Sequence, residues 1–227
     1  MLSKIDHRMC HLHAGNITTE PSNIARNLGV IFDQNLTFKS HISYVAKSVR
    51  FQLRNLSFIR KYLSKSAAEL LIHSLISSRL DFSNSLFCNL PLKEIAKLQR
   101  LQNSAARLLT YTKKYDHITP VLRSLHWLPV EKRISFKILL LMHHILYSSA
   151  PAYLQNSISF YRPARNLRSS EKQMLTVPQV KHSWGNRAFS VVGPKLWNSL
   201  PITLRQISST ESFKSSLKTY LFNINLS

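Results

Sequence analysis

Apolar residues recur at every third or fourth position along much of this chain, and this spacing constrains the fold more than any other feature. One series runs through residues 39–63, with Ile42, Val45, Val49, Leu53, Leu56, Ile59 and Leu63. A second follows Pro91, with Ile95, Leu98, Leu101, Gln102, Ala105, Leu108 and Leu109 on the inner face. Such spacing is typical of amphipathic helices that bury one side. Only four glycines occur in 227 residues, which argues against a turn-rich β fold.

The rest of the chain continues this helical pattern. Ser66 and Glu69 have the spacing of a capping box, which predicts a mostly apolar, buried helix from there to about Phe87. Further helices are expected after Thr119-Pro120, over 129–147, after Pro151, over 186–198 and over 209–223, the last capped near Ser209. Strands are expected at 28–33 and near 174–177, and residues 160–184 are expected to be irregular.

We therefore expect a mainly α protein, in which a helical bundle is followed by a second helical, partly irregular region, with one or two short strands. Three parts are expected. Residues 1–35 form a short N-terminal part with one strand, residues 36–112 form the bundle, and residues 113–227 form a C-terminal helical region of unknown role.

The chain carries a large excess of positive charge. There are 31 Lys and Arg residues against 10 Asp and Glu, which gives a formal net charge of +21. This excess predicts a polyanionic partner, with nucleic acid first and an acidic membrane surface second. The longest apolar run, residues 138–146, is too short to span a bilayer, and the N-terminus lacks the apolar core of a signal peptide. We expect an intracellular protein, in the nucleus or cytoplasm, that is neither secreted nor membrane-bound.

Basic residues form a stripe on each of the two best-defined helices, opposite the apolar face. The first stripe is Lys47, Arg50, Arg54 and Lys61, and the second is Lys93, Lys97, Arg100 and Arg107. These eight residues are the predicted contacts to nucleic-acid phosphates. Phe51 and Phe58 lie beside the first stripe, where they either stack on bases or pack against another domain.

Acidic residues are sparse, and no two are closer than twelve positions. Nucleotidyl transfer needs carboxylates that converge on metal ions, so we expect no polymerase or nuclease activity. His7, Cys10, His11 and His13 match no standard zinc pattern. His143 and His144 point in different directions on a helix, so one is expected in the core and the other exposed. We expect no cofactor, no metal and no small-molecule substrate.

Several long motifs make the chain similar to a known family. LGVIFDQNLTFKSHI at 28–42 resembles the end of the palm of reverse transcriptases from LINE-type, non-LTR retrotransposons of the jockey-like group. SRLDFSNSLFCNLP at 78–91 and LQRLQNSAARLLT at 98–110 resemble their thumb region. DHITPVLRSLHWLPVEKRISFKILLL at 116–141 and FSVVGPKLWNSLP at 189–201 resemble the segment that follows the thumb.

The resemblance implies a place in a polymerase. Residues 1–35 would be a remnant of the palm end, and residues 36–112 the thumb, which holds the template–primer duplex. Leu28, Gly29 and Val30 would take the place of the primer grip. The family's paired catalytic aspartates lie upstream of this motif, so the resemblance implies a non-catalytic fragment that binds RNA, DNA or their hybrid without sequence preference. The alternatives are a domesticated protein-interaction module and a pseudogene product without function. The sequence predicts no oligomeric state.

Overall fold

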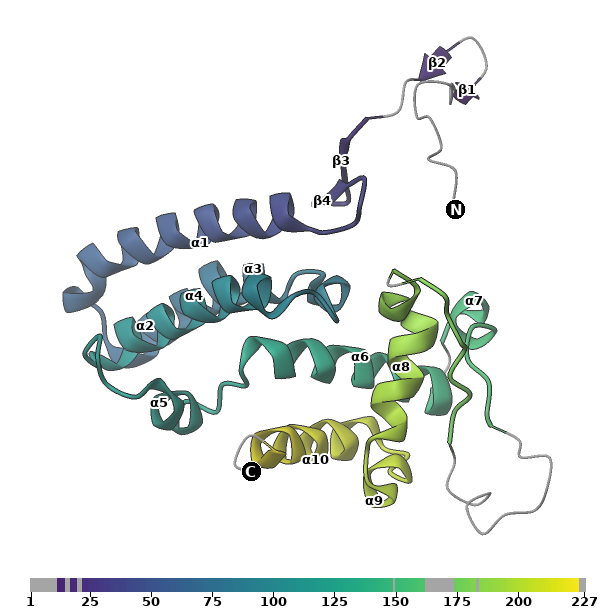
Figure 1. Ribbon diagram of the computed structural model, residues 1–227. Helices are drawn as coiled ribbons and strands as arrows, with labels where there is room; N and C mark the ends of the chain where they lie inside the picture. Colours follow the sequence, from purple (N-terminus) through teal and green to yellow (C-terminus); the bar gives the residue numbers. More distant parts are fainter. Residues whose placement is uncertain are drawn as a thin grey trace.

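The computed structural model describes residues 12–14, 17–19, 22–148, 150–161, 174–182 and 184–224. The fold is mainly helical, as the spacing of apolar residues predicts (Figure 1). Two antiparallel strand pairs precede the helices: β1 (Leu12–Ala14) with β2 (Ile17–Thr19), and β3 (Ile24–Asn27) with β4 (Val30–Asp33). This is more strand than the sequence predicts, because β1, β2 and β3 are too short to carry a readable alternation.

The expected strand at 28–33 is shorter than predicted. Asn27 pairs with Val30, so Leu28 and Gly29 form the two-residue turn of the β3–β4 hairpin. Both have positive φ, 46° and 84°, as a tight hairpin turn requires. A Cβ on Gly29 would lie 3.3 Å from the ring of Phe82, a tight contact that a small shift of this half-exposed ring would relieve, so the positive φ is the main reason for glycine here. Leu28 is exposed at the tip and Val30 is buried. The primer-grip role of these three residues remains a prediction.

The helical bundle begins with α1 (Lys39–Ile59), which continues into the short 3₁₀ helix η2 (Arg60–Tyr62). Asp33 fixes the turn before α1, because its carboxylate accepts hydrogen bonds from the backbone N–H groups of Thr37 (2.9 Å) and Phe38 (2.7 Å). Burial raises the pKa of Asp33, but these backbone hydrogen bonds outweigh it and hold the pKa below its ordinary value.

A second helical stretch crosses beneath α1. It consists of α2 (Lys65–Ile72), the π-helical turn η3 (His73–Ser77) and α3 (Ser78–Asp81), and the 3₁₀ helix η4 (Asn84–Phe87) follows. The capping box expected at Ser66 and Glu69 is wrong. Ser64 is the N-cap, and its side chain accepts a hydrogen bond from the backbone N–H of Ala67. The continuous helix also ends at Asp81, earlier than predicted.

The third bundle helix, α4 (Leu92–Thr110), starts directly after Pro91 and buries the predicted inner face, with Leu108 half-buried at its edge. Two glutamines join α4 to the next part of the chain. The side-chain amide of Gln102 donates to the carbonyl of Leu128 (2.8 Å), and Gln99 accepts from the N–H of Val130 (2.8 Å). The buried Gln102 thus has a partner, as buried polar groups require.

The C-terminal half continues the helical series. It contains α5 (Ile118–Ser124), α6 (Val130–Tyr147), α7 (Ala152–Gln155), the 3₁₀ turn η6 (Gly185–Arg187), α8 (Phe189–Asn198), α9 (Ile202–Arg205) and α10 (Thr210–Asn223). Ser209 caps α10, as expected. Leu175 forms an isolated antiparallel bridge with Phe160. Figure 1 shows successive layers from α1 through α2–α4 and α6 to α10.

Helix α6 connects two hydrophobic cores. Ile134 and Ile138 pack into the core of the bundle, whereas Leu139, Met142 and Ile145 pack into a second core with α8 and α10. Helix α8 approaches α6 so closely that a Cβ on Gly193 would lie 2.5 Å from the sulfur of Met142. The predicted boundary near residue 113, between the bundle and the C-terminal region, remains a prediction. Helix α6 lies after this boundary and still packs into the core of the bundle.

Candidate nucleic-acid interface

A groove runs between α1 and α4 on the surface of the bundle. It has a volume of about 670 Å³ and is lined by Arg50, Leu53, Arg54 and Ser57 from α1 and by Lys97, Arg100, Leu101, Ser104 and Leu108 from α4. Four of the eight predicted phosphate contacts therefore lie in one place. The leucines form an apolar floor, and the basic side chains stand along both edges of the groove.

The groove exists because α1 and α4 pack side by side and run in the same direction. Arg60, at the end of α1, is buried and donates hydrogen bonds to the carbonyls of Leu108 (3.1 Å) and Leu109 (2.9 Å), at the end of α4. It also donates to the carbonyl of Leu63 (3.0 Å). The ring of Tyr111 lies 4.4 Å from the Arg60 guanidinium carbon. Arg60 therefore fixes the alignment of the two basic edges.

The burial of Arg60 overturns one detail of the predicted apolar face of α1. The apolar spacing predicts Ile59 on the buried face, but its side chain is 43% exposed, whereas Arg60 is only 6% exposed. Arg60 lies closer to the centre of the buried face than Ile59 does, and its long side chain reaches helix-end carbonyls that lack partners within α4. The apolar spacing alone does not reveal this arrangement, because an Arg in a basic sequence is expected at the surface.

One acidic side chain lies against the groove. Glu94 is only 4% exposed, and its carboxylate accepts a hydrogen bond from the Lys97 ammonium at 2.7 Å. Lys97 is therefore partly neutralised, whereas Arg50, Arg54 and Arg100 have no acidic partner in the described part of the chain. These three arginines contribute most of the unbalanced positive charge in the groove.

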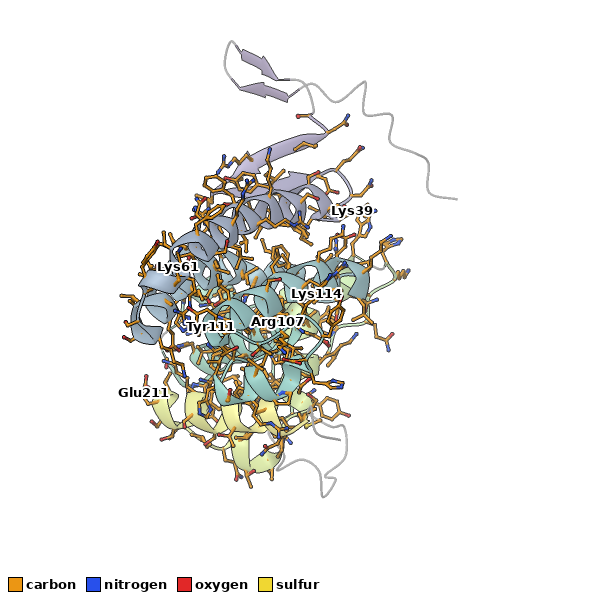
Figure 2. All side chains as sticks on the ribbon, turned by 90° about the vertical axis from the view of Figure 1, so that its left-hand side faces the viewer. Lys39, Lys61, Arg107, Tyr111, Lys114 and Glu211 are labelled. Atoms are coloured by element: carbon orange, nitrogen blue, oxygen red, sulfur yellow. The ribbon has the colours of Figure 1, made fainter. Side chains whose placement is uncertain are left out.

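The other four predicted contacts lie outside the lining of the groove. Lys47 and Lys61 are exposed on the α1 side, and Lys93 is exposed near the start of α4. Arg107 is occupied, because its guanidinium donates to the carbonyls of Lys113 (3.2 Å) and Asp116 (3.1 Å) and holds the loop after α4. Figure 2 labels Lys61, Arg107, Tyr111 and Lys114 on the end of the molecule where α1 and α4 finish.

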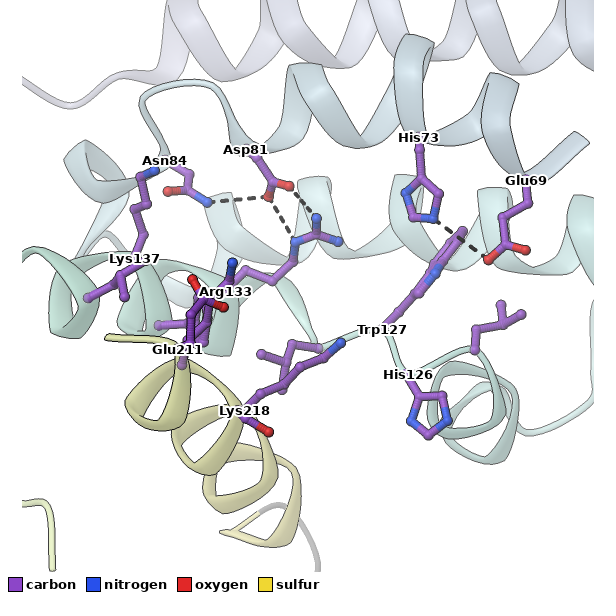
Figure 3. A pocket seen from close by; sticks show the side chains of 16 residues that line it. Glu69, His73, Asp81, Asn84, His126, Trp127, Arg133, Lys137, Glu211 and Lys218 are labelled. Carbon is purple, nitrogen blue, oxygen red and sulfur yellow. Dashed lines mark hydrogen bonds and ion pairs between the residues drawn. The ribbon is translucent and has the colours of Figure 1, made fainter. Parts of the chain in front are cut away.

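A second, larger cavity of about 780 Å³ lies between the bundle and α10 (Figure 3). It contains an ion pair between Asp81 and Arg133, and a contact of 3.7 Å between His73 and Glu69. Glu211 lies on the α10 side. The fold thus brings three acids that are far apart in sequence to one cavity. No group of three or more His, Cys, Asp or Glu in the described ranges is placed to hold a metal ion.

The candidate residues for other chemistry lie in structural positions or outside the described side chains. Burial raises the pKa of the Cys88 thiol to about 11, so this thiol stays protonated and is a poor nucleophile at neutral pH. His143 is fully buried and stacks on Phe213 at 4.3 Å between ring centres, and His144 is half-buried, close to the predicted arrangement. The cluster of His7, Cys10, His11 and His13 lies outside the described side chains.

Comparison with known proteins was made for the whole chain. No protein-family model, curated protein or solved structure matches it. Helices within the described ranges also lack the combination of length and apolar composition that crossing a bilayer requires.

Proposed function

We propose that this protein binds RNA, DNA or an RNA–DNA hybrid through the backbone, in the groove between α1 and α4. The observation that carries the proposal is that Arg50, Arg54 and Arg100 line one groove whose lining includes no acid among the described residues. Glu94 lies just outside the lining and is already paired with Lys97. Arginines in such a groove neutralise phosphates and release the counterions condensed on the nucleic acid, and contact with phosphate alone reads no sequence.

The wider charge distribution supports the same partner. Residues 34–68 contain no Asp or Glu, so α1 itself presents no carboxylate that would repel a polyanion. The resemblance of residues 28–110 to the palm end and thumb of non-LTR reverse transcriptases also supports a template–primer ligand. Within this proposal the chain acts in the nucleus or cytoplasm, takes no cofactor and catalyses no reaction. With magnesium and nucleotides it should extend no primer, and detectable incorporation would contradict this part.

The test is reversal of charge at the three unpaired arginines, Arg50→Glu, Arg54→Glu and Arg100→Glu together. Lys97 is left in place, because its reversal would set a second carboxylate beside the buried Glu94 and threaten folding. The expected result is a loss of affinity on the order of tenfold or more at moderate salt, equal for unrelated sequences.

The matched control reverses three exposed lysines outside the groove, Lys137, Lys181 and Lys218. Both variants then have the same net charge, so a difference between them reports where the charge lies. The proposal predicts affinity close to wild type for the control. Equal affinities for the two variants would contradict it. Salt-insensitive binding to a protein partner, with no binding to nucleic acid, would favour the interaction-module alternative.

A further inference from the structure

Helix α1 carries a row of exposed aromatic rings next to its basic edge. Tyr44, Phe51 and Phe58 follow one another at intervals of seven residues and are 43%, 61% and 64% exposed. Seven residues make nearly two turns of an α-helix, so the rings line up, with a rise of about 10 Å from one to the next. We call these three residues the aromatic row.

Two of the three rings are free to accept a ligand. Phe51 and Phe58 make no ring–ring or cation–π contact in the described part of the chain. Tyr44 already lies near the Arg26 guanidinium, whose central carbon is 5.5 Å from the ring centre. Large exposed apolar side chains that form a line are unusual for a surface without a partner.

The charged side chains beside the aromatic row indicate which kind of ligand binds to it. Going around α1 from its buried face, the side chains of Arg50 and Arg54 come first and the aromatic row comes next. The opposite side of the row carries uncharged polar residues such as Asn55. A docking face for an apolar protein surface would be poor in charge, whereas cations beside free rings suit phosphates and bases together.

We infer that the aromatic row binds unpaired bases of a nucleic acid whose adjoining backbone lies in the groove. Bases within a duplex are already stacked and cannot reach these rings, so the ligand must have a single-stranded segment. This inference rests on the proposed binding in the groove and narrows the ligand from any nucleic acid to one with a single-stranded segment. Stacking on a ring is tolerant of sequence, because every base has a π face.

The test compares three probes with the full chain: a blunt duplex, the same duplex with a pyrimidine extension, and the same duplex with an extension of abasic sites. The abasic extension supplies the phosphates without the bases. Wild-type protein should bind the pyrimidine probe more tightly than either of the others. The variant with both Phe51→Ala and Phe58→Ala should lose this extra affinity for the pyrimidine probe, by a factor of about five or more for each ring. Its affinities for the blunt and abasic probes should stay unchanged.

Two further variants separate stacking from other roles of the rings. Phe51→Leu with Phe58→Leu keeps apolar side chains but removes the π faces, so it should lose the gain as the alanine variant does. Phe51→Tyr with Phe58→Tyr should retain it. Tyr153→Ala, at another exposed aromatic residue, is the matched control and should behave as wild type. Unchanged thermal unfolding should accompany these surface changes.

The outcomes distinguish this inference from the proposed function. Suppose that the arginine variant loses affinity for all three probes, but the alanine variant still binds the pyrimidine probe more tightly than the other two. That result would overturn the aromatic-row inference and leave the proposed function standing. Retention of the gain in the leucine variant would also overturn it, and would indicate an apolar contact. If the alanine variant abolished self-association while binding every probe normally, the row would be a contact between copies of the chain.

Discussion

Two buried histidines are held in the neutral form by what surrounds them. The N–H of Ile31 donates to Nδ1 of His41 at 3.3 Å, so this nitrogen carries no proton. Nε2 of His143 lies 2.8 Å from the carbonyl of Ile207, so this nitrogen is the donor; this hydrogen bond raises the pKa of the ring, but burial outweighs it. Burial is the main cause that lowers the pKa of each ring, and Arg26 adds to it for His41.

Stability should therefore fall as the solution becomes acidic. Both folded-state pKa values lie below the ordinary value of 6.5, so the unfolded chain binds protons first as the pH falls below 6.5. Each histidine then removes up to about 1.4 kcal/mol of unfolding free energy per pH unit, until its own folded-state pKa is reached. Above 6.5 neither contributes a slope.

The measurement is urea unfolding at a series of pH values. His41→Asn keeps an acceptor near Ile31 but does not titrate, so it should lower stability at neutral pH and flatten the slope below 6.5. His182→Asn, at an exposed position, should leave the slope as in wild type. An equal slope in the His41 variant and wild type would show that His41 does not contribute.

At the scale of helices, the apolar spacing predicts α1, α4 and α6 closely, because each buries one face over several turns. The spacing does not predict where a helix begins when side-chain hydrogen bonds set the first residue. Ser64 and Ser66 are both plausible caps, and only the structure shows that Ser64 bonds to Ala67. The two basic stripes are predicted on separate helices, but periodicity along one helix does not reveal which other helix lies beside it.

The end of the groove gives an element-scale prediction. Arg60→Ala should lower the unfolding free energy by about 2–3 kcal/mol, because the buried carbonyl of Leu109 and the partly buried carbonyl of Leu108 lose their donor. Arg60→Lys should recover only part of this, since an ammonium cannot reproduce the fork geometry of the guanidinium.

Chemical denaturation measures the difference between these variants and wild type. The control is Arg54→Ala, an exposed arginine on the same helix, which should change stability by no more than about 0.5 kcal/mol. If Arg60→Ala were as mild as the Arg54 change, the alignment of α1 and α4 would depend on the apolar contacts alone.

For the whole molecule, net charge predicts the kind of partner but not its place. A charge of +21 spread evenly would attract any polyanion weakly. The fold instead sets Arg50 and Arg54 opposite Arg100, and uses Arg60 and Arg107 to hold backbone carbonyls. Both uses look alike in the sequence, since nothing in the composition separates a binding arginine from a structural one.

The most direct test of the central claim is the salt dependence of binding to a duplex. The logarithm of the association constant should fall linearly with the logarithm of salt concentration for wild-type protein. Reversal of Arg50, Arg54 and Arg100 should flatten that slope by up to about three, whereas the control at Lys137, Lys181 and Lys218 should keep it. Equal slopes for wild type and the arginine variant would contradict the claim that phosphates bind in this groove.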